Sequence, residues 1–128
     1  MARPRNFEED DVLVSAAAVF GRLGYNAASI DDLVTATGLQ RGSLYKAFGS
    51  KRNLFEKVLR RALSDNWHQR GESIDLMITS LKDLAADDAP IAALCREAIG
   101  RCREDAAAIL GARLLQHLTD EKEPPCPR

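Results

Sequence analysis

Two short amphipathic segments separated by a glycine turn constrain the fold of this chain most strongly. The first covers residues 29–37, where Ser29 and Asp32 have the spacing of a capping box. Gly38 ends it, and the second segment covers residues 41–48. Two short helices joined by a three- or four-residue turn with glycine are typical of a helix-turn-helix. Neither helix is long enough to be stable alone, so neighbouring helices must hold its apolar face.

The second segment predicts one apolar face and one small, polar face. Successive helical residues rotate by about 100°, which places Leu44 and Phe48 together on the inner side. A glycine on the outer side costs roughly 1 kcal/mol relative to alanine, a cost that is understandable if another molecule must approach closely. The outer arc holds Gly42, Ser43 and Lys46, flanked by Arg41, Tyr45 and Ala47.

Positive charge is concentrated in the region that follows the glycine turn. Between residues 41 and 61 the chain has seven basic residues against one acidic residue, although its net charge is only −1. Ser50 is placed to cap a helix that begins at Lys51, where a cation opposes the helix dipole. A bound phosphate would remove that conflict, because free backbone N–H groups and Lys51 could bind it together. The net charge alone gives no indication of a nucleic-acid partner, but the distribution of charge does.

The remaining sequence predicts an all-α protein with a short helical C-terminal part. Period-two alternation of β-branched residues is absent, so strands have little to be built from. We expect a three-helix DNA-binding domain over residues 1–50 and a connecting helix over 51–70. A helical dimerisation or regulatory domain over 71–120 and a disordered tail over 121–128 would complete the chain.

Within the C-terminal part, the periodicity predicts one long helix over residues 89–118, with Gly100 as its weakest point. Its stripe of small and branched side chains suits packing against a partner's copy. An apolar stripe of this kind is more often plain core than a ligand site. The candidate effector pocket, for a small apolar effector, is formed by Trp67, Met77, Leu94 and Cys95.

Several classes of protein are disfavoured by what the sequence lacks. No Ser-His-Asp set, paired carboxylates, phosphate loop or metal motif is present, so we expect neither an enzyme nor a cofactor. Cys95 and Cys102 are seven residues apart on the expected helix, about 10.5 Å, which is too far for a mutual disulfide. They could pair across a dimer or touch a metal with His117, although inert buried thiols are the more common case. No apolar run reaches the length of a membrane span, and we expect a cytoplasmic protein.

The order of these residues resembles that of the TetR family of bacterial transcription regulators. The resemblance covers residues 12–59, in the pattern VL..AA..VF...GY...SI.DL....GL.RGSLY.AF.SK..LF. It implies a dimer that binds double-stranded operator DNA through the N-terminal domain and releases it when a small molecule enters the C-terminal domain. We therefore expect a homodimeric transcriptional regulator that acts as a repressor. An alternative is a shortened interaction protein that heterodimerises with a full-length regulator and does not bind DNA alone.

The resemblance also implies which side chains contact DNA. Positions matching Arg41, Gly42, Ser43 and Ala47 face the major groove, and Lys46 could contact either bases or phosphate. Positions matching Ser29, Tyr45 and Lys51 contact phosphate, and the helix-start reasoning adds Ser50. The chain departs from the family pattern twice: Ala28 replaces a common threonine, and Gln40 replaces the usual Ser or Thr N-cap. Both departures weaken the expected set of contacts.

Overall fold

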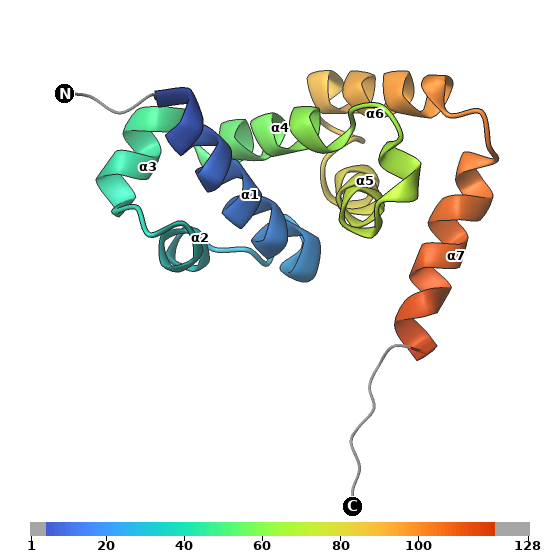
Figure 1. The fold of residues 1–128 in the computed structure, drawn as a ribbon, viewed down its shortest axis with the longest axis horizontal. Helices are drawn as coiled ribbons and strands as arrows, with labels where there is room; N and C mark the ends of the chain where they lie inside the picture. The colour runs from blue at the N-terminus through green and yellow to red at the C-terminus, as the bar shows by residue number, and fades with distance from the viewer. Residues whose placement is uncertain (1–4, 120–128) are drawn as a thin grey trace, which may run out of the picture.

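The computed structural model describes residues 5–119, with the side chains of residues 9–118. Within this range every regular element is a helix and there is no strand (Figure 1). The all-α fold predicted from the sequence is therefore confirmed for the described residues. In chain order the elements are α1 (Arg5–Leu23), α2 (Ile30–Thr37), α3 (Arg41–Phe48), α4 (Lys51–Ala62), the 3-10 helix η1 (Trp67–Gln69), α5 (Gly71–Asp83), α6 (Ala89–Arg101) and α7 (Ala106–Thr119).

An aromatic cluster at the junction of α1 and α4 stabilises the N-terminal domain. The rings of Phe20 and Phe55 meet edge to face with centroids 4.9 Å apart, and Tyr25 lies 5.3 Å from Phe55. Phe20 and Phe55 are completely buried, as are Leu33 of α2 and Leu59 of α4. Such edge-to-face pairs add to the free energy gained by burying apolar surface. The short helices α2 and α3 are thus held by a core that α1 and α4 largely supply.

Two glycines end α1 and α2 because both positions require a left-handed backbone. Gly24 has φ +87° and Gly38 has φ +79°, a region that residues with a Cβ rarely adopt. Their N–H groups donate to the carbonyls of Phe20 (2.8 Å) and Val34 (3.0 Å), which satisfies acceptors at the helix ends. The helix end predicted at Gly38 is confirmed, and Gly24 ends α1 in the same way.

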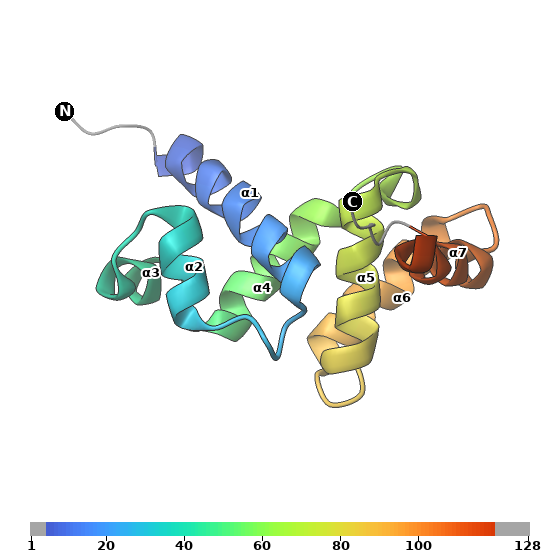
Figure 2. The ribbon, with the colours of Figure 1, turned by 90° about the horizontal axis from the view of Figure 1, so that it is seen from below.

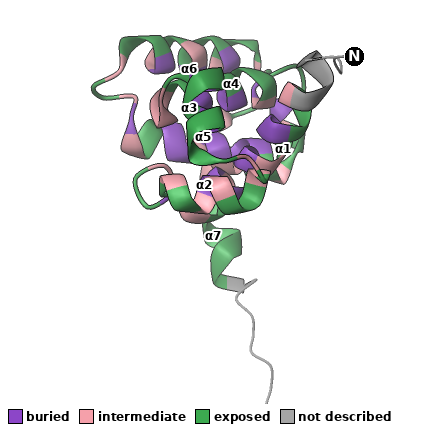
Figure 3. Ribbon diagram, turned by 90° about the vertical axis from the view of Figure 1, so that its left-hand side faces the viewer, coloured by how far each residue is buried: buried purple, intermediate pink, exposed green. Residues whose placement is uncertain are grey.

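In the C-terminal part, α5 lies at the centre. Figure 2 shows it between α1 and α4 on one side and α6 and α7 on the other, and it contacts all four. Its inner face is fully buried, whereas α7 extends away from the body and is coloured as mostly exposed in Figure 3. The core residues from α5 and α6 are Ile74, Leu76, Met77, Ile91, Cys95 and Ala98.

The connecting helix is shorter than the expected range of residues 51–70. Helix α4 ends at Ala62, and Asn66 adopts a left-handed conformation with φ +63° before η1 begins. The guanidinium of Arg70 holds this turn, donating to the carbonyls of Ala62 and Asp65, each at 3.1 Å. Gly71, the first residue of the expected dimerisation or regulatory domain, begins α5.

The single helix expected over residues 89–118 is also wrong, because the structure contains two helices. Helix α6 ends at Arg101, and Cys102 has an extended backbone with ψ 122°. The Asp105 carboxylate accepts a hydrogen bond from the N–H of Ala108 (3.1 Å), which caps a new helix there. Arg113 then binds Asp75 of α5 through both carboxylate oxygens, at 2.8 and 2.9 Å. Because α7 packs against α5, its direction differs from that of α6. The apolar periodicity of the sequence continues across residues 102–105, so it did not predict this break.

No helix within the described range is long and apolar enough to cross a membrane. The disorder expected for residues 121–128 concerns a segment outside the described residues.

Candidate nucleic-acid interface

Helix α3 presents the two faces that its sequence predicts. Leu44 and Phe48 are buried, with 3% and 7% of their surface exposed, whereas the opposite side faces outward. A Cβ added at Gly42 would meet no atom within 4 Å, so the outer surface is open at this point. The exposed residues of this face are Arg41, Gly42, Ser43, Tyr45, Lys46 and Ala47. All five residues predicted to face bases are therefore on the exposed surface of α3.

Arg41 has a partner within the protein. Its guanidinium forms an ion pair with Asp31 of α2, and both side chains are well exposed, at 54% and 81%. Exposed ion pairs of this kind are weak because water screens them. Arg41 can therefore exchange Asp31 for a guanine or a phosphate at small cost, but the pair was not foreseen from the sequence.

The start of α2 has the capping box that the sequence predicts. The Ser29 hydroxyl oxygen accepts from the N–H of Asp32 (2.9 Å), and the Asp32 carboxylate accepts from the N–H of Ser29 (3.0 Å). The hydrogen bond from the Ser29 backbone lowers the pKa of Asp32. The Ser29 hydroxyl proton remains a donor for a phosphate, but Asp31 and Asp32 place two negative charges beside it. This end of α2 is consequently a poorer phosphate site than the sequence reasoning implied.

The start of α4 combines a serine cap with a lysine that has an internal role. Ser50 accepts from the N–H of Asn53 (3.0 Å), as predicted. The Lys51 ammonium donates to the carbonyls of Tyr25 (2.9 Å) and Ala28 (2.8 Å), and lies 4.4 Å from the centre of the Tyr25 ring. Two of its three N–H donors are therefore used within the protein. Lys51 fixes the α1–α2 connection to α4 and keeps one donor for a phosphate.

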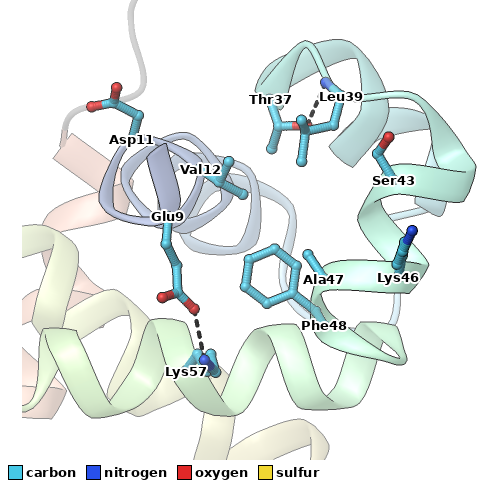
Figure 4. Close-up of a pocket in the computed structure, with 10 residues that line it drawn as sticks. All are labelled: Glu9, Asp11, Val12, Thr37, Leu39, Ser43, Lys46, Ala47, Phe48 and Lys57. Atoms are coloured by element: carbon cyan, nitrogen blue, oxygen red, sulfur yellow. Dashed lines mark hydrogen bonds and ion pairs between the residues drawn. The ribbon is translucent and has the colours of Figure 1, made fainter. Parts of the chain in front are cut away.

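A groove of about 660 Å³ runs beside the exposed face of α3. Figure 4 shows Glu9 and Val12 of α1 on one side, with Ser43 and Lys46 of α3 on the other. Lys57 of α4 closes one end by an ion pair with Glu9, 2.6 Å between Nζ and the carboxylate oxygen. The groove is thus a feature of the candidate interface, with acidic groups on its α1 wall and lysines near α3 and α4.

Two aspartates join the N-terminal domain to the C-terminal helices, and the sequence reasoning assigned a role to neither. Asp83 accepts from the backbone N–H groups of Tyr25 (3.1 Å) and Asn26 (3.3 Å). Burial disfavours its charge, but the neighbouring lysine ammonium and these two N–H groups outweigh burial and lower the pKa of Asp83. For Asp88, the sequence contained one indication of a role: an aspartate two positions before Pro90 is typical of a helix N-cap.

Asp88 forms what we call the Arg52–Asp88 clamp. The Arg52 guanidinium donates from Nε and Nη2 to the two carboxylate oxygens of Asp88, both at 2.7 Å. Asp88 also accepts from the N–H of Ile91 (3.2 Å), and so caps α6. These hydrogen bonds, that from Arg52 above all, lower the pKa of Asp88. The clamp ties the start of α6 to the start of α4, next to the predicted phosphate site.

The four residues of the predicted effector pocket are packed into the core. Trp67, Met77 and Cys95 are at most 2% exposed, and Leu94 is partly buried. The Trp67 indole N–H donates to the carbonyl of Ala98 at 3.1 Å. None of the four lines the groove beside α3, and Trp67 alone of them lines a second, polar pocket formed with residues 101–104. An effector at this position would have to open the core.

The cysteines do not form a reactive or metal-binding group in the described part of the chain. Burial raises the pKa of the Cys95 thiol, and Cys102 lies beyond the end of α6 rather than on the same helix face. No cluster of His, Cys, Asp and Glu among the described residues is arranged to hold a metal ion. Cys95 is thus an inert core thiol at neutral pH.

Comparison with known proteins places this interface among bacterial regulators. Residues 12–58 match the family model described as "Bacterial regulatory proteins, tetR family". The chain is 32% identical over 89 residues to the HTH-type transcriptional repressor BdcR of Escherichia coli, covering 70% of this chain and 40% of that protein.

Two further relatives match over the N-terminal domain. The chain is 40% identical over 63 residues to the uncharacterized HTH-type transcriptional regulator YezE of Bacillus subtilis, covering 49% of this chain and 32% of YezE. It is 44% identical over 59 residues to the HTH-type transcriptional repressor ComR of E. coli, covering 46% of this chain and 28% of ComR. The chain spans less than half the length of each of these curated relatives.

Proposed function

From the premise that this chain belongs to the TetR family of bacterial regulatory proteins, we propose that it is a dimeric transcriptional repressor. Helix α3 enters the major groove of operator DNA, and a small-molecule effector releases the complex. The observation that carries the proposal is the outer face of α3, where base-reading side chains surround an uncrowded Gly42. A helix must approach the groove floor closely to read base edges, and this face permits that approach.

The division of roles on this surface follows from chemistry. Arg41 and Ser43 read base edges, and an arginine bound to guanine through two hydrogen bonds contributes about 1–3 kcal/mol of discrimination. Tyr45, which is 43% exposed, and the start of α4 at Ser50 and Lys51 contact phosphates and set the register. Lys46 and Ala47 complete the base-facing surface.

Helix α7 supports the dimeric part of the proposal. It exposes Leu114, Leu115 and Leu118 by 50%, 65% and 73%, an unusual concentration of exposed leucine on one helix. Apolar patches of this kind mark interaction surfaces in soluble proteins. A two-fold dimer is also what two operator half-sites require.

A shortened interaction protein remains the alternative, because the same leucines could bind a full-length regulator. Size-exclusion chromatography with light scattering, combined with a DNA shift assay, separates the two functions. A stable homodimer that shifts DNA removes the alternative, whereas a monomer that shifts DNA only when mixed with a longer relative removes the homodimer.

Operator binding tests the main proposal. A binding site is first selected from random duplexes, and affinity is then measured over a range of salt concentrations. Lys51→Met should lower the salt slope by about 0.9, the effect of one lost phosphate contact. Tyr45→Phe should weaken binding to all sequences, and Arg41→Ala should relax the preference at one base pair. Arg96→Gln, on the exposed side of α6, is the matched control. The proposal is wrong if the Tyr45 and Lys51 variants bind as tightly as the parent at every salt concentration.

A further inference from the structure

A polar pocket of about 410 Å³ lies between the turn around η1 and the α6–α7 connection. Residues 65–68 form one side and residues 101–104 form the other. Its volume is within the range of small-molecule sites, about 300–1,000 Å³. The pocket is separate from the α3 surface, and three of the four residues of the predicted apolar effector pocket are absent from its lining.

The charges in this pocket are balanced. Arg101 and Arg103 contribute two guanidinium groups, and Asp65 and Glu104 contribute two carboxylates. A purely anionic ligand would be opposed by the carboxylates, and an apolar ligand would desolvate all four charges without compensation. A small zwitterion satisfies both sets of groups, because guanidinium binds carboxylate through paired hydrogen bonds and carboxylate binds ammonium. The lining therefore favours a molecule with the charge pattern of an amino acid.

One side chain of the lining is incompletely satisfied. Nδ1 of His68 is closed off from solvent and has no hydrogen-bond partner among the described residues. A ring nitrogen left in this state destabilises the local arrangement, because it has lost water without gaining a partner. The His68 ring packs edge to face on Trp67, with centroids 5.9 Å apart. A polar ligand that hydrogen-bonds to Nδ1 of His68 would therefore stabilise a rearranged turn around η1.

Arg101 connects this pocket to α4. Its guanidinium donates to the carbonyl of Leu63, the C-cap residue of α4, and lies 4.0 Å from Asp65. At the opposite end, the Arg52–Asp88 clamp ties the starts of the same two helices. Helix α6 is therefore attached to α4 at both ends, and Arg101 provides the attachment nearest the pocket. A ligand carboxylate that binds Arg101 competes with the Leu63 carbonyl for its donors.

We propose that this pocket binds a small amino-acid-like zwitterion and that binding releases α4 at its C-terminal end by drawing Arg101 away from Leu63. Helix α4, still held at its start by the Arg52–Asp88 clamp, then changes its tilt, and α1 and α3, which pack against α4, change their orientation with it. The regulatory half of this inference rests on the proposed function, whereas ligand binding to the pocket does not.

Ligand binding can be followed without DNA, because the chain has two histidines that serve as probe and control. His68 lines the pocket, and His117 lies on α7 beside Asp75. The full chain is titrated with glycine, L-glutamate and L-lysine, and the ring C–H resonances are observed by NMR. Acetate and methylamine, which each carry one of the two charges, are the chemical controls. We expect a zwitterion to shift His68 saturably, with His117 unchanged and with smaller shifts from acetate and methylamine.

Arg101→Gln should weaken the binding about tenfold, since it removes a pair of charge-assisted hydrogen bonds. Arg96→Gln changes an exposed arginine of the same helix that does not line the pocket, and should bind as the parent does. Thermal unfolding of both variants shows whether the fold is retained, and Arg103→Gln provides a second test if Arg101→Gln does not fold. The ligand site is refuted if no zwitterion shifts His68 saturably, or if acetate binds as tightly. Binding that leaves affinity for the selected operator unchanged refutes the coupling to α4. Failure of the operator assay alone leaves the NMR result standing.

Discussion

Asp88→Asn isolates the ionic part of the Arg52–Asp88 clamp. Asparagine caps a helix about as well as aspartate, so the bond from the N–H of Ile91 can be kept while the negative charge is lost. The Arg52 and Asp88 side chains are 29% and 17% exposed. Exposed ion pairs contribute about 0.2–1 kcal/mol, and breaking a fully buried pair costs about 3–5 kcal/mol. A partly buried pair with two hydrogen bonds of 2.7 Å lies between these limits. We expect Asp88→Asn to lower the free energy of unfolding by about 1–2 kcal/mol.

Asp88→Ala should cost about 1 kcal/mol more, because it also removes the cap of α6. The measurement is urea denaturation followed by circular dichroism, with a double-mutant cycle in which Arg52→Met is the second change. Asp87→Asn is the matched control, since Asp87 is the exposed neighbour and should change stability by less than about 0.5 kcal/mol. A coupling energy below about 0.3 kcal/mol, or equal effects at positions 87 and 88, would refute the reasoning.

Two further predictions concern stability in acid and the exposed face of α3. The pKa values of Asp83 and Asp88 are lower in the folded protein than in the unfolded chain, so the unfolded chain binds more protons as the pH falls. The free energy of unfolding should therefore decrease as the pH falls below about 4, and the decrease should be smaller in Asp88→Asn than in the parent protein. Urea denaturation at several pH values measures both decreases. Equal decreases in the two proteins would contradict this prediction. Gly42→Ala should raise stability by up to about 1 kcal/mol, because the added methyl group is uncrowded and alanine favours the helix, and it should weaken operator binding in the shift assay. Gly38→Ala, at φ +79°, should instead lower stability by about 1 kcal/mol or more, and a stabilised Gly42→Ala variant with unchanged DNA affinity would show that close approach is not needed there.

The sequence by itself determined the features that depend on neighbouring residues. The caps at Ser29 and Ser50 and the helix ends at Gly24 and Gly38 are local, because each depends on a backbone conformation or a hydrogen bond within a few positions. The inner and outer faces of α3 follow from helical rotation alone. For this reason the helix-turn-helix and its exposed surface could be predicted without a structure.

Only the tertiary structure decided which long charged side chains form hydrogen bonds within the protein. Lys51 binds carbonyls more than twenty positions earlier in the chain, and Arg52 reaches Asp88 thirty-six positions later. The ends of α4 and α6 were likewise decided by tertiary contacts. Arg70 holds the turn after α4, and α7 packs on α5 through Arg113, although the apolar periodicity of the sequence continues past both helix ends. Periodicity reports which face of a helix is apolar, but the partner of a charged group depends on which distant backbone the fold brings within hydrogen-bond distance.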